Sequence, residues 1–413
     1  MAAAEINWMF VDLNSYFASV EQELCPELRG QPIAIIPIEP VDSACCIAVS
    51  YQAKAYGVKT GFRVMDARAV CPHIILVAAR PKLYVDFHHR VASAIEKCIP
   101  IHSVLSCDEF SCQLMGSERT LRKATSIAYA IKNELRHVGD TLRCSVGLAP
   151  NRLLAKIAGD MLKPDGLMIL QRKHLPHALY SLKIEDIPGI GSQMQQRVRA
   201  AGIETMQQLC ALPREKMHAI WGSVLGDRLD LWLKGEDFLE PPARPLQTIS
   251  RQHILPPKCR VRENARGVAF KMLHACGRRM RRQNLWTSGM ALSVGFYNRD
   301  RFDGSFRIPP CQDTFTLQEH LLMLWERVPD GTLSDLAVTL THLDTEPYPD
   351  LFGFNGPTAR DDLMGAVDRV NARYGLNTVY LGSIHNVRQE VPTRIPFGPP
   401  PPLEEFEDAA DRE

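Results

Sequence analysis

Three acidic residues stand at the ends of apolar runs and could hold metal ions. Asp12 follows the apolar residues 8–11, and the adjacent Asp108 and Glu109 lie in the segment SCDEF. Carboxylates from separate strands can hold two divalent ions, and such a pair drives phosphoryl transfer with little covalent help from the protein. The alternative is that the three acids only cap strand ends. Neighbours on a regular strand point to opposite faces, so Asp108 and Glu109 reach one site only at a strand end or a turn.

The sequences around these acids resemble one enzyme family. The segment FVDLNSYFASVE around Asp12 and the segment SCDEF around Asp108 are similar to the Y-family of lesion-bypass DNA polymerases, of the bacterial polymerase IV or polymerase V catalytic-subunit type. The resemblance implies that Asp12 and Asp108 bridge two metal ions, that Glu109 favours the catalytic ion, and that the carbonyl of Leu13 binds the nucleotide-bound ion. Oxygen ligands suit Mg²⁺. We therefore expect two Mg²⁺ ions, with Mn²⁺ as an alternative.

The activity implied by this resemblance is template-directed DNA synthesis. A deoxynucleoside monophosphate would be added to a primer 3′ end with release of pyrophosphate, at an open, low-fidelity site that serves translesion synthesis in DNA repair. Two other classes stay open. A noncatalytic scaffold would resemble a family branch that has lost its metal-binding acids, but Asp12, Asp108 and Glu109 are present here. A nucleotide cyclase also positions two metals with strand-end acids, but it would leave the DNA-binding motif described below unexplained.

A second segment, AVSYQAKAYGVKTG, resembles the family's finger helix that binds the nucleotide triphosphate. Tyr51 and Lys54 lie one helical turn apart, so both could contact the same anion. The sequence departs from the family here, because Lys54 stands where arginine is usual and Ala48 where a small hydroxyl residue is frequent. Lysine keeps the charge but loses the bidentate fork of arginine. The alternative for Lys54 is a solvated helix lysine.

The longest match is the segment SVGLAPNRLLAKIAGDMLKPDG, at residues 145–166. Within it, Lys163 stands where the family places a lysine on the β- and γ-phosphates, and Asp160 would support the local structure. Lys156 lies on a similar face of the same predicted helix and is interpreted as a structural or surface residue. Lys163 therefore joins Tyr51 and Lys54 as an expected nucleotide-binding residue.

Phe17 aligns with the steric gate of the family, an aromatic side chain that occupies the space a ribose 2′-hydroxyl would need. Exclusion of a competing substrate by bulk is a plausible source of selectivity. The alternative is a core phenylalanine beside Tyr16. Asn14 is a further departure, since many relatives have aspartate there, and its neutrality removes one charge near the metals.

Two features point to DNA. The segment IPGIGS predicts a helix-hairpin-helix in which Gly189 and Gly191 let backbone amides approach a phosphate without reading sequence, although a purely structural turn is the alternative. Basic residues also crowd the end of a predicted helix at residues 262–283, where they could contact phosphates or simply favour the negative end of the helix dipole. These residues are Arg278, Arg279, Arg281 and Arg282.

Protein partners are suggested by the C-terminal part of the chain. The segment YPDLF is a poor approximation to a sliding-clamp peptide without the usual glutamine, and Leu351 and Phe352 would be its anchors unless they pack down as ordinary loop residues. Residues 363–379 resemble the tail of the polymerase V catalytic subunit, which suggests accessory mutagenesis proteins as further partners. We expect primer-template DNA and a dNTP as substrates.

These residues must be positioned by several domains. Apolar patterns predict strands at residues 8–11, 142–148, 248–255, 290–297, 302–308 and 333–343, and helices at residues 51–56, 84–98, 121–138, 262–283 and 316–327. His88 and His89 are expected on a helix surface. Residues 174–235 are expected to be all-helical, a proline-rich linker follows, and residues 392–402 are expected to be extended and flexible.

The fold class is α+β, multidomain, and the resemblance implies a right-hand polymerase. We expect a palm (residues 1–14 and 80–171), fingers (15–79), a helical thumb with the helix-hairpin-helix (172–240), a little finger (246–345) and a partly flexible C-terminal tail (346–413). A chain of 413 residues with 45% hydrophobic residues can bury several cores.

Composition is compatible with DNA binding. The net charge is only +1, but residues 403–413 hold six acids against one arginine, which leaves about +6 on the rest of the chain. The twelve cysteines are scattered without zinc-like spacing, as expected for reduced thiols. No apolar run approaches the roughly 20 residues of a membrane helix. We expect a cytoplasmic protein, associated with the bacterial nucleoid, that does not bind a membrane.

Overall fold

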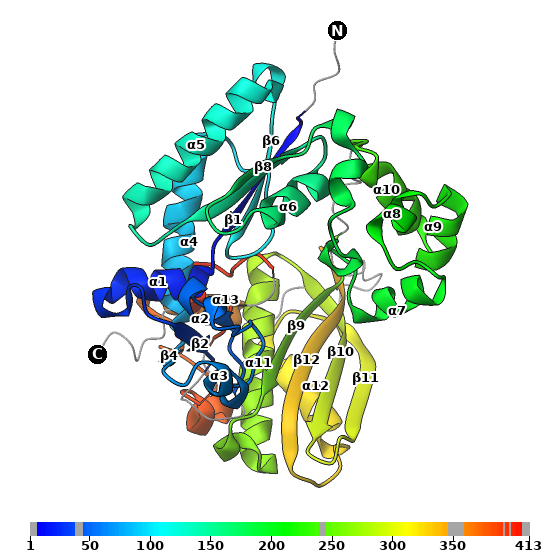
Figure 1. The fold of residues 1–413 in the computed structure, drawn as a ribbon. Coiled ribbons are helices and arrows are strands. Elements are labelled where there is room, and N and C mark those ends of the chain that lie inside the picture. Colours follow the sequence, from blue (N-terminus) through cyan, green and yellow to red (C-terminus); the bar gives the residue numbers. More distant parts are fainter. Residues whose placement is uncertain are drawn as a thin grey trace. The chain divides into compact units, whose positions relative to one another are not determined.

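The structure is a computed structural model that describes residues 6–37, 44–238, 245–345, 359–390, 393–395 and 398–406 (Figure 1). The chain divides into two compact units. The N-terminal unit comprises Met1–Glu240 and Ile395–Pro401, and the C-terminal unit comprises Pro241–Arg394 and Pro402–Glu413. No helix in the described part of the chain is both long enough and apolar enough to cross a membrane.

The N-terminal unit is organised around a five-stranded sheet. Its strand order is β5 (Ser103–Val104), β6 (Glu109–Gln113), β1 (Trp8–Leu13), β7 (Cys144–Ala149) and β8 (Leu167–Ile169). The central strand β1 is antiparallel to both β6 and β7. All six residues of β1 are buried, which explains why its sequence is a continuous apolar run rather than an alternating one.

Helices cover both faces of this sheet. Met9 and Val11 pack with residues of α4 (Pro81–Glu96) and α5 (Leu121–Val138), whereas Trp8 and Phe10 pack with residues of α6 (Arg152–Met161). Because side chains alternate along a strand, Asp12 belongs to the same face as Phe10. The strand predicted at residues 8–11 extends two residues further, since Asp12 and Leu13 still pair with Ser145 and Cys144 of β7.

A smaller sheet follows β1 in sequence. Its order is β3 (Ala48–Val49), β2 (Ile33–Ile36) and β4 (Ile75–Ala78), with helices α1 (Tyr16–Leu24), α2 (Tyr51–Ala55) and α3 (Val64–Val70). Helix α2 begins after Ser50, whose hydroxyl accepts a hydrogen bond from the amide of Ala53. This N-cap fixes the start of the helix that carries Tyr51 and Lys54.

The segment predicted to be all-helical, residues 174–235, contains short 3₁₀ turns and α-helices, the last of which ends at Leu233. Short 3₁₀ turns lead into α7 (Ser192–Ala200), α8 (Met206–Cys210), α9 (Arg214–Trp221) and α10 (Val224–Leu233). Their apolar residues, including Ile187, Val198 and Leu229, form one cluster with Leu154 and Ile157 of α6. The helical segment is therefore held to the large sheet through α6.

The C-terminal unit contains a four-stranded antiparallel sheet (Figure 1). Its order is β11 (Arg301–Cys311), β10 (Trp286–Phe296), β12 (Leu333–Asp344) and β9 (Thr248–Ile254). Helices α11 (Arg262–Arg282) and α12 (Thr314–Glu326) bury apolar residues against one face of the sheet, where Leu336, Val338 and Leu340 point. Strand β10 begins four residues earlier than predicted, because Trp286 and Thr287 still pair with β12.

The other face of this sheet, which we name the open face, carries small and polar side chains. Its register across β10 and β12 places Ala291 opposite Thr339 and Ser293 opposite Ala337. The outer strand β11 adds Arg301, Asp303, Ser305 and Arg307, and β9 adds Thr248, Ser250, Gln252 and Ile254, all of them exposed.

Residues that we assigned to a C-terminal tail add to the core of the C-terminal unit. Helix α13 (Ala359–Tyr374) is followed by a 3₁₀ segment (Gly382–Val387) that packs against α11 through the buried Ile384 and Val387. Gly267 of α11 would bring a Cβ to 3.0 Å from Val387, so the two segments are in close contact.

Candidate active site

The three predicted acids lie on adjacent strands at one edge of the large sheet. Asp12 of β1 is opposite Glu109 of β6, and the amide of Leu13 donates a hydrogen bond to the carbonyl of Asp108 over 2.9 Å. Strand β6 begins at Glu109, so Asp108 lies just outside it. Asp108 and Glu109 therefore lie at a strand end, the condition under which these neighbours could reach one site.

The carboxyl of Asp12 is buried in a negative environment. The pKa of Asp12 is raised to about 7, chiefly by burial, with smaller increases from the charges of Asp108 and Asp160, although Lys163 lowers it. A carboxylate in these surroundings is stabilised by a nearby cation. The site therefore favours positive charge beside Asp12.

Two lysines of the α6 region supply that charge. The ammonium of Lys163 lies 2.9 Å from Oδ2 of Asp12 and 2.7 Å from Oδ1 of Asp160. Although burial lowers the pKa of Lys163, Asp12 and Asp160 raise it above its ordinary value. The ammonium of Lys156 lies 2.6 Å from Oε1 of Glu109, so Lys156 contacts a predicted catalytic acid rather than standing apart as a surface residue.

The donor set fits a divalent cation. Within the described residues, no group of three His, Cys, Asp or Glu side chains is arranged to hold a metal ion, and the carboxylates of Asp12 and Glu109 are paired with Lys163 and Lys156. Carboxylate and carbonyl oxygens are nevertheless the ligands that Mg²⁺ prefers. The pKa of Asp12 stays raised even though Lys163 lies beside it, so a second positive charge near this carboxyl would be favourable. Movement of the two lysines would leave oxygen donors suited to a metal.

The predicted nucleotide-binding residues lie close to the same edge. The ammonium of Lys54 is 4.2 Å from the ring centre of Tyr51. Burial lowers the pKa of Lys54, and the charge of Lys163 lowers it further. Burial raises the pKa of Tyr51, the charge of Lys163 lowers it, and the charge of Asp12 raises it. Helix α2 thus brings Tyr51 and Lys54 within electrostatic range of Lys163 and the acids.

Phe17 stacks on a tyrosine that is itself held in place. The rings of Phe17 and Tyr84 are 4.4 Å apart at an angle of 17°. The hydroxyl of Tyr84 donates to Oε1 of Glu21 over 2.7 Å, and the fully buried Glu21 is also paired with Arg80. Glu21 and Tyr84 were missed in the sequence. The signal that could have found them is an acid directly after the apolar residues Ala18 and Val20 of the same helix, because a buried carboxylate requires a partner.

His88 also differs from the expectation of a surface residue. It is 4% exposed, its Nδ1 lies 2.8 Å from the carbonyl of Cys107, and its ring stacks on Phe110. Burial lowers the pKa of His88. These contacts join α4 to the segment that carries Asp108, so His88 supports that segment. The neighbouring His89 is exposed, as predicted.

The helix-hairpin-helix residues are exposed at the start of a helix. Gly189 has φ of +91°, a conformation that side chains rarely adopt, and Gly191 is the N-cap of α7. A Cβ at either glycine would meet no atom within 4 Å. Ile187 and Ile190 are buried beside them, so the turn is anchored while its glycines stay accessible.

The basic cluster of α11 is divided between internal and exposed residues. Arg281, whose side chain is 10% exposed, donates to both carboxylate oxygens of Asp368 and to Gln312 and Thr314, so the structure gives it a role in holding α13. Arg282 is exposed and pairs with Glu405.

The two remaining arginines of this cluster also differ. Burial lowers the pKa of Arg278, whereas Arg279 is exposed. The predicted clamp anchors Leu351 and Phe352 lie outside the described residues.

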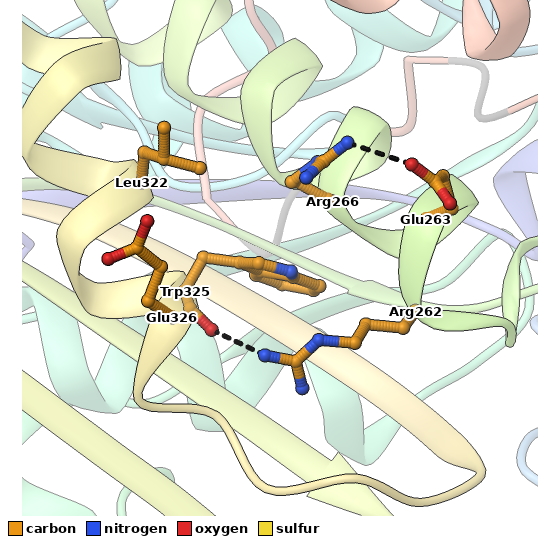
Figure 2. Close-up of a pocket in the computed structure, with 6 residues that line it drawn as sticks. All are labelled: Arg262, Glu263, Arg266, Leu322, Trp325 and Glu326. Atoms are coloured by element: carbon orange, nitrogen blue, oxygen red, sulfur yellow. Dashed lines mark hydrogen bonds and ion pairs between the residues drawn. The ribbon is translucent and has the colours of Figure 1, made fainter.

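A pocket of about 220 Å³ lies in the C-terminal unit and contains none of the predicted site residues (Figure 2). Its lining comprises Arg262, Glu263, Arg266, Leu322, Trp325 and Glu326. The guanidinium of Arg262 donates to the carbonyls of Trp325 and Val328. Arg262 therefore satisfies carbonyls at the end of α12, which is a structural role.

Comparisons with known proteins show the family of the chain. The chain matches the impB/mucB/samB family over residues 11–160 and the C-terminal domain of that family over residues 246–350. DNA polymerase IV of Moorella thermoacetica is 30% identical, over 92% of this chain and 96% of the relative. DNA polymerase IV 1 of Bacillus subtilis is 26% identical, over 90% and 92% of the two chains.

Solved structures have the same fold. A Y-family DNA polymerase chimera of Dbh and Dpo4 has a TM-score of 0.69 at 23% identity, covering 82% of this chain and 99% of the other. The insertion ternary complex of Dbh DNA polymerase has a TM-score of 0.57 at 22% identity, with the same coverage. At these identities the likeness concerns the fold.

Proposed function

Because the chain belongs to the Y-family of DNA polymerases, through its impB/mucB/samB regions, we propose that Asp12, Asp108 and Glu109 form its nucleotidyl-transfer centre. The protein is a DNA-directed DNA polymerase that performs translesion synthesis in damage tolerance, and it depends on divalent metal ions. One observation carries the residue assignment: β1 and β6 bring the three acids to one edge of the sheet, opposite two lysines.

The acids would share the work of holding two divalent ions. Asp12 and Asp108 would hold both ions, Glu109 would hold the catalytic ion, and the carbonyl of Leu13 would bind the nucleotide-bound ion. When bound, the two ions supply activation of the primer 3′-hydroxyl and neutralise charge on the leaving pyrophosphate. Mg²⁺ is the expected metal, and Mn²⁺ is an alternative.

Lys163, Lys54 and Tyr51 would bind the triphosphate. With metal ions held by the acids, the ammonium of Lys163 would be free to contact phosphate oxygens, and the hydroxyl of Tyr51 could donate a hydrogen bond to the triphosphate. Lys54 adds a point charge instead of the two-pronged contact of an arginine. Lys54 already lies against Tyr51, so the two can approach the same phosphate.

Phe17 would select the sugar. Its ring stacks on the ring of Tyr84, whose hydroxyl donates a hydrogen bond to the buried Glu21. A fixed aromatic ring excludes a 2′-hydroxyl more effectively than a ring that can turn aside, because steric exclusion requires that the side chain cannot give way.

Primer-template DNA would contact both units. The exposed amides at Gly189 and Gly191 suit a phosphate of the backbone. The open face of the C-terminal sheet offers small side chains that permit close approach of a duplex, with Arg301 and Arg307 on its outer strand. Arg279 and Arg282 remain candidates for further phosphate contacts, whereas Arg278 and Arg281 are less accessible.

Protein partners are proposed on sequence alone. A sliding clamp would bind through Leu351 and Phe352, and accessory mutagenesis proteins would bind the C-terminal segment that resembles polymerase V. A protein that acts on chromosomal DNA is expected at the bacterial nucleoid.

Primer extension tests the proposed function. Purified protein with Mg²⁺, dNTPs and a primer-template should extend the primer on intact templates and across a defined lesion, with and without a clamp. Binding of primer-template without any extension under these conditions would favour the noncatalytic scaffold. Formation of a cyclic monophosphate from a nucleotide without any primer would favour the cyclase.

A further inference from the structure

Lys163 is carried by a short turn whose position is set by other parts of the N-terminal unit. Helix α6 ends at Met161, and β8 begins at Leu167. Residues 162–166, which we name the lysine turn, connect them. Because Lys163 lies within this short connection, whatever holds the turn also sets where its ammonium can reach.

Asn14 holds the lysine turn from the end of β1. It is 3% exposed. Its Oδ1 accepts a hydrogen bond from the amide of Asp165 over 2.7 Å, and its Nδ2 donates to the hydroxyl of Ser145 over 3.1 Å. Ser145 in turn donates to the carbonyl of Leu162 over 3.2 Å and accepts from the amide of Gly166 over 3.4 Å. Asn14 and Ser145 therefore bind the turn at both of its ends.

Lys132 holds the same turn from α5. Its side chain is 10% exposed. Its ammonium donates to the carbonyl of Asp165 over 2.9 Å, to the carboxylate of Asp165 over 2.7 Å and to the carbonyl of Cys144 over 2.6 Å. Because its acceptors belong to both the lysine turn and β7, the ammonium of Lys132 joins the turn to that strand.

The turn has little room to shift. A Cβ on Gly166 would lie 1.8 Å from the carbonyl oxygen of Leu162, and a Cβ on Gly147 of β7 would lie 1.9 Å from the carbonyl oxygen of Ala155. The two ends of the turn are thus in backbone contact with each other, and α6 is in backbone contact with β7. A displaced turn would have to break hydrogen bonds rather than slide.

We propose that Asn14 and Lys132 are positioning residues that place Lys163 for triphosphate binding, an inference that rests on the proposed function of Lys163. An amide is needed at position 14 because it both donates and accepts. An aspartate could accept from Asp165 but could not donate to Ser145. Ser145 would then turn its proton toward position 14 and release the carbonyl of Leu162. Asn14 is therefore matched to this turn, and its neutrality is more than the loss of a charge.

The test measures nucleotide binding separately from chemistry. Asn14→Ala, Asn14→Asp and Lys132→Met would be compared with wild type by equilibrium binding of a dNTP to the protein on a dideoxy-terminated primer-template with Ca²⁺, and by single-turnover extension with Mg²⁺. The Kd for dNTP should rise about tenfold in Asn14→Ala and Lys132→Met, as expected when two or three hydrogen bonds that orient a binding group are lost. The extension rate at saturating dNTP should change by less than about threefold.

A double variant identifies the route of the effect. Lys163→Ala alone should weaken dNTP binding, and Asn14→Ala should cause no further loss when added to Lys163→Ala, because both act through one ammonium. Asn371→Ala is the matched control. Asn371 is also a buried asparagine that donates to and accepts from backbone, both bonds being with Val379 of the C-terminal unit. It should lower thermal stability and leave the Kd for dNTP unchanged.

The outcomes separate two failures. An unchanged Kd for dNTP in Asn14→Ala, while Lys163→Ala weakens binding, would overturn the positioning role and leave the proposed function intact. Additive losses in the double variant would overturn it as well. An unchanged Kd in Lys163→Ala would instead remove Lys163 from the triphosphate site, and the positioning proposal would fall with it. Asn14→Asp should show a smaller rise than Asn14→Ala, and a Kd equal to that of wild type would overturn the need for an amide.

Discussion

The edge of the large sheet and the open face of the C-terminal sheet differ in how they use charge. At the edge, acids and lysines meet within hydrogen-bonding distance and are largely buried, as in the pairs of Asp12 with Lys163 and of Glu109 with Lys156. On the open face, small side chains lie between exposed charged ones such as Arg307. A chemical step requires side chains held in fixed positions, whereas contacts to the phosphates of DNA tolerate small changes in side-chain position. Substitutions at the edge should therefore affect rate and selectivity, and substitutions on the open face should affect DNA affinity.

Asp108→Asn should have the largest effect. Extension should fall about a thousandfold or more, because loss of a metal-binding carboxylate removes several kcal/mol of transition-state stabilisation. The affinity for primer-template should stay within about twofold, since Asp108 lies away from the expected phosphate contacts. Single-turnover extension and fluorescence anisotropy measure the two quantities. Retained extension would remove Asp108 from the catalytic centre.

Phe17→Ala should have the next largest effect, on selectivity. The preference for dNTP over rNTP should fall by about a hundredfold, the scale at which one side chain excludes a substrate by bulk. Competition between dCTP and CTP on the same template measures the ratio. Tyr84→Ala should cause a smaller loss in the same direction, because Tyr84 only supports the ring of Phe17. Unchanged sugar selectivity in Phe17→Ala would contradict the gate.

Ala291→Glu tests the other side of the comparison. A carboxylate in the middle of the open face should raise the Kd for primer-template about tenfold at low salt, through repulsion of phosphates. The extension rate of bound complexes should not change. Fluorescence anisotropy at several salt concentrations and single-turnover extension measure the two quantities. A lower extension rate with unchanged DNA affinity would break the division between the two regions.

The control for Ala291→Glu adds the same charge to the same unit at another place. Met323 is 58% exposed on α12, the helix that packs against the opposite face of the sheet. Met323→Glu should therefore leave the Kd for primer-template within about twofold of wild type, because its carboxylate lies away from the open face. Equal losses in the two variants would mean that the net charge of the unit, rather than the open face, determines DNA affinity.

Arg279→Ala should have the smallest effect. It should weaken primer-template binding about threefold and reduce the slope of log Kd against log salt by about 1, as expected for one phosphate contact. Arg281→Ala, two residues along the same helix, should instead lower the melting temperature, because its guanidinium holds Asp368. An identical salt slope in Arg279→Ala and wild type would exclude Arg279 from the DNA interface.

Much of the edge could be predicted from the sequence because its residues stand in contiguous motifs. Asp12, Asp108, Glu109, Phe17 and Lys163 each lie in a segment that resembles the family. Their partners could not be found in this way. Whether Lys156 meets Glu109 depends on how α6 packs across β1, and the sequence separation between the two residues carries no information about that packing.

The C-terminal unit was predicted through its elements rather than its contacts. The strand predicted at residues 333–343 corresponds to β12, but nothing in the basic end of α11 indicated that Arg281 would turn inward. That outcome depends on Asp368, a residue of α13 that we had assigned to a separate tail. Long-range ion pairs of this kind are decided by tertiary packing, and a local charge pattern does not reveal them.

The lysines at the edge of the large sheet have a consequence for folding. Since Lys163 and Lys156 neutralise Asp12 and Glu109 directly, the N-terminal unit does not need a metal ion to offset buried negative charge. The protein should therefore fold, be stored and melt at nearly the same temperature in a chelating buffer as in Mg²⁺. Metal ions would then bind reversibly to a protein that is already folded, and their removal would not unfold it.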